Sequence, residues 1–200
     1  MNTTARAGEA ATVSSTATVE GPVVTSAARK ALAALRIAFG LTFLWAFFDK
    51  LLALGFATGR TVDPETGVET VDRFGDAAWI NGGSPTEGFL SFGTKGPFAD
   101  FYQSFAGAAW ADWLFMIGLL GIGVTLTLGI GMRLGTAAGA VLYMLMWSAY
   151  LPPDNNPVLD DHVLGALTMV VLGLTAAGST WGLGEPWGRT TLVRRSRWLR

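Results

Sequence analysis

The stretch Tyr150-Leu-Pro-Pro-Asp-Asn-Asn-Pro-Val-Leu-Asp-Asp-His162 lies between two long apolar segments of a 200-residue chain. It carries three carboxylates, two carboxamides and the only histidine of the protein. The prolines end one helix, the Asn-Asn-Pro sequence is typical of a turn, and Asp160 or Asp161 can cap the helix that follows. We therefore expect a polar turn that joins two helices at the mouth of a bundle.

The composition on either side of this turn is that of a membrane protein. Half of the residues are hydrophobic (50%), 14% are charged and the mean hydropathy is +0.41. Apolar segments at residues 31–54, 110–130, 134–151 and 163–183 each approach the roughly 20 residues that a helix needs to cross a bilayer. These segments predict an all-α polytopic membrane protein: a bundle of four transmembrane helices with a structured extracytoplasmic loop between helices 1 and 2.

The distribution of lysine and arginine predicts how the chain is oriented. With four spans, one side holds both ends of the chain and the short turn at Arg133, and most of the basic residues fall there. Only Arg60, Arg73 and Lys95 fall on the other side. The positive-inside rule then predicts a multi-pass plasma-membrane protein with cytoplasmic termini. Residues 1–28 are expected to be a disordered cytoplasmic tail, residues 29–187 the membrane domain, and residues 188–200 a basic cytoplasmic tail lying on anionic lipid.

The first apolar segment contains three charged residues. Arg36 is close enough to the cytoplasmic end that we expect its side chain to snorkel to the surface. Asp49 and Lys50 lie near the outer end, and charges at such depth commonly find partners inside a bundle. His162, at the start of an uncharged span, is expected within reach of either residue.

The loop at residues 55–109 is too long to be a simple connection. Turn residues at 64–67 between two β-branched stretches predict a small hairpin, and Ser84 can cap a short helix. Aromatic residues at positions 98, 101, 102 and 105 predict a helix that lies among lipid headgroups or folds over the bundle mouth. Seven acidic residues against three basic ones make this loop a poor surface for nucleic acid.

Two patterns within the spans allow more than one interpretation. The glycines at 118, 121, 123 and 129 are spaced somewhat like a dinucleotide-binding motif, but no strand precedes them, so close helix packing is the better explanation. Tyr143, Trp147 and Tyr150 form an aromatic stripe at helical spacing. Such a stripe either packs against neighbouring helices or forms the wall of a site for a flat ligand such as a quinone.

Several kinds of chemistry find no support in this chain. It has no cysteine, so it forms no disulfide and cannot ligate an iron–sulfur cluster through thiolates. Its single histidine rules out a bis-histidine haem built from one copy. Asp154, Asp160, Asp161 and His162 match no specific metal-ligand spacing, so no metal site is predicted. Redox chemistry would need an organic cofactor, a substrate held directly or a partner subunit.

With these motifs in view, the chain resembles the DoxX family, and more closely its DoxD branch, the membrane subunit of thiosulfate:quinone oxidoreductase. The resemblance covers about residues 31–187. It rests on Arg36, on Trp45-Ala-Phe-Phe-Asp-Lys50, on Trp79-Ile-Asn-Gly-Gly-Ser-Pro-Thr-Glu-Gly-Phe-Leu90, on Asn156-Pro157 and on Asp161-His162. It implies a four-helix membrane bundle that passes electrons from thiosulfate to quinone, together with a second redox subunit.

On this hypothesis, His162, oriented by Asp161, moves the protons of quinone reduction, and Asp49 and Lys50 complete the catalytic group. Lys50 and Arg60 would bind the thiosulfate dianion. The quinone would lie against an aromatic wall formed by Trp45, Phe47, Tyr143, Trp147 and Tyr150.

Two other functions remain open. One is a non-enzymatic membrane scaffold or accessory subunit that recruits redox or stress-response partners. The expected protein partner is a second redox subunit or another copy of the same chain in a homo-oligomer. The other, a small-solute transporter, has less support because the sequence shows no broken helices or paired half-repeats. Membrane lipid is an expected partner in every case, and nucleic acid in none.

Overall fold

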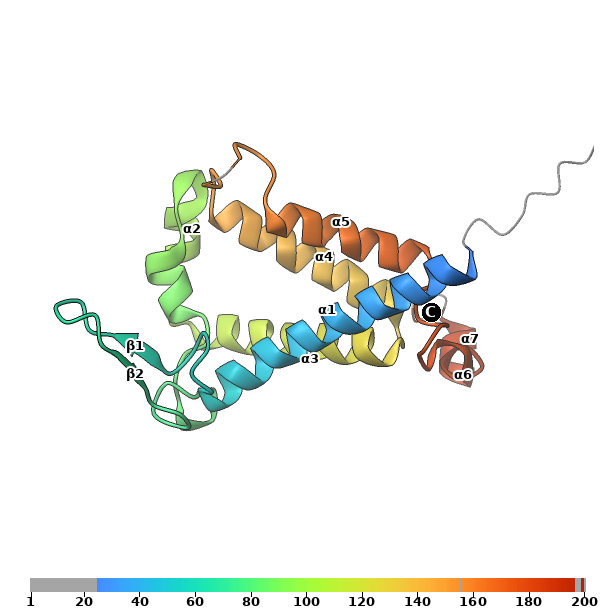
Figure 1. The fold of residues 1–200 in the computed structure, drawn as a ribbon, viewed down its shortest axis with the longest axis horizontal. Coiled ribbons are helices and arrows are strands. Elements are labelled where there is room, and N and C mark those ends of the chain that lie inside the picture. The colour runs from blue at the N-terminus through green and yellow to red at the C-terminus, as the bar shows by residue number, and fades with distance from the viewer. Residues whose placement is uncertain (1–24, 155, 197–198, 200) are drawn as a thin grey trace, which may run out of the picture.

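A computed structural model describes residues 25–154, 156–196 and 199, and this part of the chain is mostly helical. Two helices, α1 (Ser26–Leu52) and α3 (Ala109–Leu128), are long and apolar enough to cross a membrane. They lie beside α4 (Met132–Ala149) and the shorter apolar helix α5 (Asp161–Leu174) (Figure 1). Residues 1–24 of the predicted N-terminal tail lie outside the described residues, and residues 26–28 form the first turn of α1.

The ends of the long helices follow local signals in the sequence. The Thr25 hydroxyl caps α1 by accepting the Ala28 N–H at 3.2 Å. Gly129 ends α3 in the left-handed conformation (φ 73°), and Gly131 (φ 59°) precedes α4. The fourth apolar segment differs from the prediction, because α5 ends at Leu174 and the chain then forms irregular turns. These turns bring Gly178 so close to Gly129 that a Cβ on Gly178 would lie 2.5 Å from the Gly129 carbonyl oxygen.

The four long helices pack in sequence: α1 on α3, α3 on α4, and α4 on α5. Glycine permits the closest crossings. A Cβ on Gly123 would lie 2.8 Å from Leu44 of α1, and one on Gly165 would lie 2.8 Å from the Tyr143 ring. Gly118 and Gly121, which the sequence also assigned to packing, have nothing near their missing Cβ atoms. The core between the helices consists of Phe43, Met116, Leu119, Ile122, Leu126, Met132, Met169, Leu172 and Ala177.

The long loop forms a structured cap at what we call the hairpin end of the molecule (Figure 1). It contains the predicted hairpin, with β1 (Arg60–Val62) antiparallel to β2 (Glu69–Val71). Short helical turns follow at Trp79–Asn81, Phe89–Gly93 and Gly96–Phe98, and then α2 (Ala99–Gln103). Asp112 in the first turn of α3 accepts hydrogen bonds from the Ser84 and Thr86 hydroxyls, which fixes the loop to that helix.

The opposite end, which we call the C-terminal end, is closed by α6 (Gly184–Gly188) and α7 (Thr191–Arg195) (Figure 1). Val193 is fully buried, so α7 is folded onto the protein rather than extended as a tail. Arg36 is also fully buried here. Its guanidinium donates to backbone carbonyls at the end of α3 and in the turns after α5, and these are the oxygens of Leu126, Thr127, Thr180 and Trp181. The prediction that Arg36 snorkels to the surface is therefore wrong.

Candidate functional site

His162 lies at the start of α5 and forms a hydrogen-bonded pair with Asp160. The Asp160 carboxylate caps the helix by accepting the His162 and Val163 N–H groups at 3.1 Å. Its second oxygen lies 2.7 Å from His162 Nδ1. An ionised carboxylate can only accept, so Nδ1 carries the proton and Nε2 of the neutral ring is left as an acceptor. Among the described residues, no group hydrogen bonds to Nε2.

The electrostatics of Asp160 reflect its several neighbours. Partial burial favours the neutral acid, but the hydrogen bond with His162 and the two backbone N–H groups outweigh it and lower the pKa of Asp160. The carboxylate therefore stays ionised and keeps the imidazole in one orientation. This arrangement suits a group that accepts or passes a proton at Nε2.

Asp161, which the sequence predicted as the residue orienting His162, does not do so. Its side chain is exposed, and the contact with Nδ1 is made by Asp160. The two aspartates are adjacent, and helix geometry decides between them. The N-cap residue has an extended backbone that turns its side chain back toward the first turn, whereas the first helical residue points its side chain away. The sequence limited the cap to these two residues without deciding between them.

Tyr143 brings a phenol next to the Asp160–His162 pair. Its ring meets the His162 ring edge to face, with centroids 6.4 Å apart. On its other side it packs edge to face against Phe39 and Phe43 of α1, at 6.2 and 5.6 Å. Its hydroxyl has no hydrogen-bond partner in the part of the chain that the structure describes. The Tyr143 hydroxyl and the His162 imidazole are thus two groups that can exchange protons with a ligand, and they lie beside the apolar rings of Phe39 and Phe43.

Asp49 and Lys50 are not joined to this cluster. Asp49 is 1% exposed, and its two oxygens accept the N–H groups of Phe56 and Ala57 at 3.1 and 2.9 Å. The carboxylate therefore fixes the turn after α1. The Lys50 ammonium lies 6.0 Å from the centre of the Phe115 ring on α3, and no described carboxylate forms an ion pair with it. The contacts described for His162 include neither residue.

The polar turn after α4 is held by the loop cap. The Lys95 ammonium pairs with Asp154 and lies 3.7 Å from the centre of the Tyr150 ring, whose hydroxyl donates to Asp154 at 2.7 Å. The hydrogen bond between these two side chains lowers the pKa of Asp154 and raises the pKa of Lys95. Trp147 donates its indole N–H to the Val158 carbonyl at 2.8 Å. Trp147 and Tyr150 therefore fix the turn.

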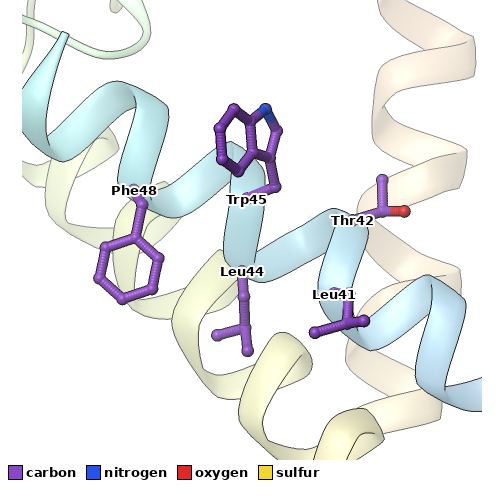
Figure 2. Close-up of a pocket in the computed structure, with 5 residues that line it drawn as sticks. All are labelled: Leu41, Thr42, Leu44, Trp45 and Phe48. Atoms are coloured by element: carbon purple, nitrogen blue, oxygen red, sulfur yellow. The ribbon is translucent and has the colours of Figure 1, made fainter. Parts of the chain in front are cut away.

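The predicted aromatic wall is divided over several surfaces. Trp45 lies on the outer face of α1, where it lines an apolar groove of about 500 Å³ with Leu41, Thr42, Leu44 and Phe48 (Figure 2). Thr42, the one hydroxyl side chain in this lining, donates to the Ala38 carbonyl at 3.0 Å. Phe47 packs against the core instead. The groove suits an aliphatic chain, because its lining is almost entirely apolar and the Trp45 indole N–H is the main donor that it offers to a ligand.

Arg60, the second residue predicted to bind substrate, is used within the hairpin. Its guanidinium pairs with Glu69 at 3.1 Å and donates to the Gly55 carbonyl at the same distance. No group of three or more metal-ligating side chains occurs within the described residues. The predicted site residues are therefore dispersed. His162 and Tyr143 lie together, Asp49, Arg60, Trp147 and Tyr150 hold turns, and Trp45 lines the outer groove. Phe47 packs against the core, Lys50 lies beside Phe115 and Asp161 is exposed.

Comparison of the chain with protein-family models, curated proteins and solved structures found no match. The His162 cluster is therefore defined by its own geometry. Sequence reasoning missed the Ser84 and Thr86 contacts to Asp112, since no local pattern connects residues so distant in the chain. Asp160, in contrast, was visible as a candidate helix cap.

Proposed function

We propose that the protein is a four-span membrane bundle of the DoxD type that carries out quinone-linked redox chemistry, with Asp160, His162 and Tyr143 handling protons. The membrane part of the proposal is supported by large apolar side chains exposed on all four long helices. Examples are Leu41, Ile117, Val141 and Leu167, each more than half exposed. Water would penalise such a surface, and lipid would not.

The charges support the orientation of this bundle. Every described carboxylate except that of Glu185 lies at the hairpin end or on the helix ends that meet it. The C-terminal end carries a set of basic residues: Arg29, Lys30, Arg36, Arg133, Arg189, Arg194 and Arg195. By the positive-inside rule, the C-terminal end faces the cytoplasm and the His162 cluster lies near the outer surface.

The observation that carries the redox proposal is the Asp160–His162 pair beside Tyr143. Quinone reduction takes up two electrons and two protons, and both carbonyl oxygens become hydroxyls. In the DoxD-type reaction, two thiosulfate ions release two electrons as they join to form tetrathionate. His162 Nε2 and the Tyr143 hydroxyl supply positions for the protons, and Lys50, which forms no ion pair with a described carboxylate, would attract the anionic donor.

Quinone reduction by variants of the purified protein tests this proposal. The protein is reconstituted in lipid with thiosulfate, a soluble quinone and membrane extract supplying any second subunit, and loss of the quinone ultraviolet absorbance is followed. We expect His162→Gln to lower the rate roughly 10²–10⁴-fold. Asp160→Asn keeps a good helix cap but disturbs the imidazole orientation, so its rate is expected to fall as well.

Asp161→Asn is the matched control, since it removes the same charge one residue away without touching His162. We expect it to retain the wild-type rate. Equal rates for Asp160→Asn and Asp161→Asn would refute the assigned role of the pair. Wild-type protein that binds no quinone and reduces none with its partner subunit present would refute quinone chemistry altogether.

A second candidate function is a non-enzymatic scaffold, and one observation favours it. Asp49 and Arg36, the most deeply buried charged residues described, both hydrogen bond to backbone groups. Polar residues used in this way hold a structure together and need no substrate. On this alternative, the wild-type protein has no turnover, and His162→Gln would change only its thermal stability or its capture of a partner.

A further inference from the structure

A pocket at the C-terminal end opens between the start of α4, the end of α5 and α6. Its volume is about 380 Å³. Arg133, Ser179 and Glu185 contribute polar groups to its wall, and Leu174 and Trp187 contribute apolar ones. The wall is therefore mixed in character, unlike the apolar groove beside Trp45. A ligand that fits it has a polar head and an apolar part.

An exposed apolar ridge on α5 leads into this pocket. Leu164, Leu167, Val171 and Leu174 follow one another at spacings of three and four, so they share one face of the helix. They are 57%, 57%, 46% and 82% exposed, and Leu174 itself lines the pocket. At 1.5 Å per residue the ridge is about 15 Å long, about half of a 30 Å hydrocarbon core. That length matches a single leaflet.

The charges around the pocket favour an anionic head. Arg133 lies in its wall, and Arg189, Arg194 and Arg195 belong to the adjoining α6–α7 region. Glu185 is the only described carboxylate at this end, and it lies 3.9 Å from Arg189, which offsets its charge. Guanidinium groups bind phosphate through paired hydrogen bonds, and basic pockets on the cytoplasmic side of membrane proteins attract anionic headgroups.

We propose that this pocket binds one phospholipid of the inner leaflet, with its phosphate at Arg133 and one acyl chain along the α5 ridge. The site rests on the membrane orientation given above and not on the redox chemistry. The bound lipid joins the start of α4 to the C-terminal region that closes over Arg36. It therefore connects the basic end of the protein to the surrounding membrane.

Native mass spectrometry of the full chain in mild detergent, titrated with phosphatidylglycerol, tests the site. We expect wild-type protein to retain one lipid per chain at low lipid concentration. Arg133→Gln is expected to weaken this binding by roughly five-fold or more, as loss of one basic contact near a membrane surface predicts. Arg29→Gln is the control, because it removes a charge from the same end but lies on α1, outside the pocket wall.

Leu174→Ser separates a lipid from a free phosphate ion. A lipid site loses affinity when the ridge is made polar, and it is not emptied by millimolar inorganic phosphate. Equal lipid retention by Arg133→Gln and Arg29→Gln would overturn the proposal, as would full competition by phosphate with no effect of Leu174→Ser. Should Arg133→Gln fail to fold by circular dichroism, Leu174→Ser alone decides the outcome.

Quinone reduction is measured separately, so its absence would leave the lipid result unaffected. A wild-type chain recovered without any membrane association would instead refute the orientation on which the lipid site depends.

Discussion

Replacement of Arg36 tests whether this residue snorkels to the surface or locks the bundle. In the structure its guanidinium joins two segments that are far apart in sequence. One terminal nitrogen donates to the Leu126 carbonyl and, at 3.2 Å, to the Thr127 carbonyl. The other donates to Trp181 at 2.9 Å and to Thr180 at 3.4 Å. The carbonyls at the end of α3 also carry the negative end of the helix dipole, which stabilises the cation.

The cost of removing this contact follows from its two principal hydrogen bonds, to Leu126 and to Trp181. A hydrogen bond to a charged group contributes about 1.5–3 kcal/mol, so losing both costs about 3–6 kcal/mol. In Arg36→Leu, burial of the new side chain returns roughly 1.5–3 kcal/mol. We expect a net loss of about 1.5–3 kcal/mol. Arg36→Lys keeps the charge but cannot reach both segments, so it should lose about 1.5–3 kcal/mol.

Thermal unfolding in detergent measures the loss, with Arg29→Leu and Arg29→Lys as controls on the exposed start of α1. For a chain of this size, the expected decrease in melting temperature for Arg36→Leu is roughly 3–12 °C. Hydrogen exchange should also accelerate at Leu183, whose N–H bonds to the Leu128 carbonyl at 2.8 Å in the segment that Arg36 holds. Melting temperatures for Arg36→Lys and Arg36→Leu equal to wild type would refute the lock and restore the snorkelling interpretation.

The remaining predictions concern other fixed contacts. Asp49→Asn replaces one of two accepting oxygens with a donor that faces a backbone N–H. The free energy of unfolding, measured with denaturant, should therefore fall by about 1–3 kcal/mol. Wild-type stability would contradict the structural role of Asp49. Gly165→Ala should lower the melting temperature because its Cβ would meet the Tyr143 ring, whereas Gly121→Ala, with open space at its Cβ, should not. Because the ion pair with Lys95 lowers the pKa of Asp154, its stabilisation is present above the ordinary value of 3.8 and is lost as the pH falls through the lower folded value. The protection of amides in residues 94–103, measured relative to their intrinsic exchange rates at each pH, should therefore fall in acid, and protection that does not change with pH would contradict this.

The sequence was sufficient to place α3, α4 and the start of α5, because their signals are local. Apolar length located α3 to within two residues and α1 to within five, and the prolines and the aspartate cap located the turn between α4 and α5. The hairpin followed from its turn residues. The end of α5 was misjudged by nine residues, since residues 175–183 are nearly as apolar as a helix but are turned by contacts with Gly129 and Arg36.

The partners of the charged residues could not be predicted in the same way. A sequence shows that Asp49 and Lys50 share the end of one helix, but it does not show that the Asp49 carboxylate turns back to its own loop. Arg36 was expected to reach water because it lies near a helix end, yet the C-terminal segment covers that end. Both errors arise from backbone groups, which offer hydrogen bonds at every residue and leave no signature in the sequence.

The difference between polar side chains held by backbone groups and those with an atom left for a ligand also indicates where chemistry can occur. The Asp49 carboxylate is buried and holds the turn after α1 through two backbone N–H groups, so a substrate could reach it only if that turn moved. His162 differs, because Asp160 occupies only Nδ1 and thereby fixes Nε2 as the atom left for another partner. Tyr143 lies against the same imidazole ring. A ligand that donates a proton or a hydrogen bond to Nε2 can therefore be bound at this position without disrupting the fold, which is why His162→Gln should separate loss of activity from loss of stability.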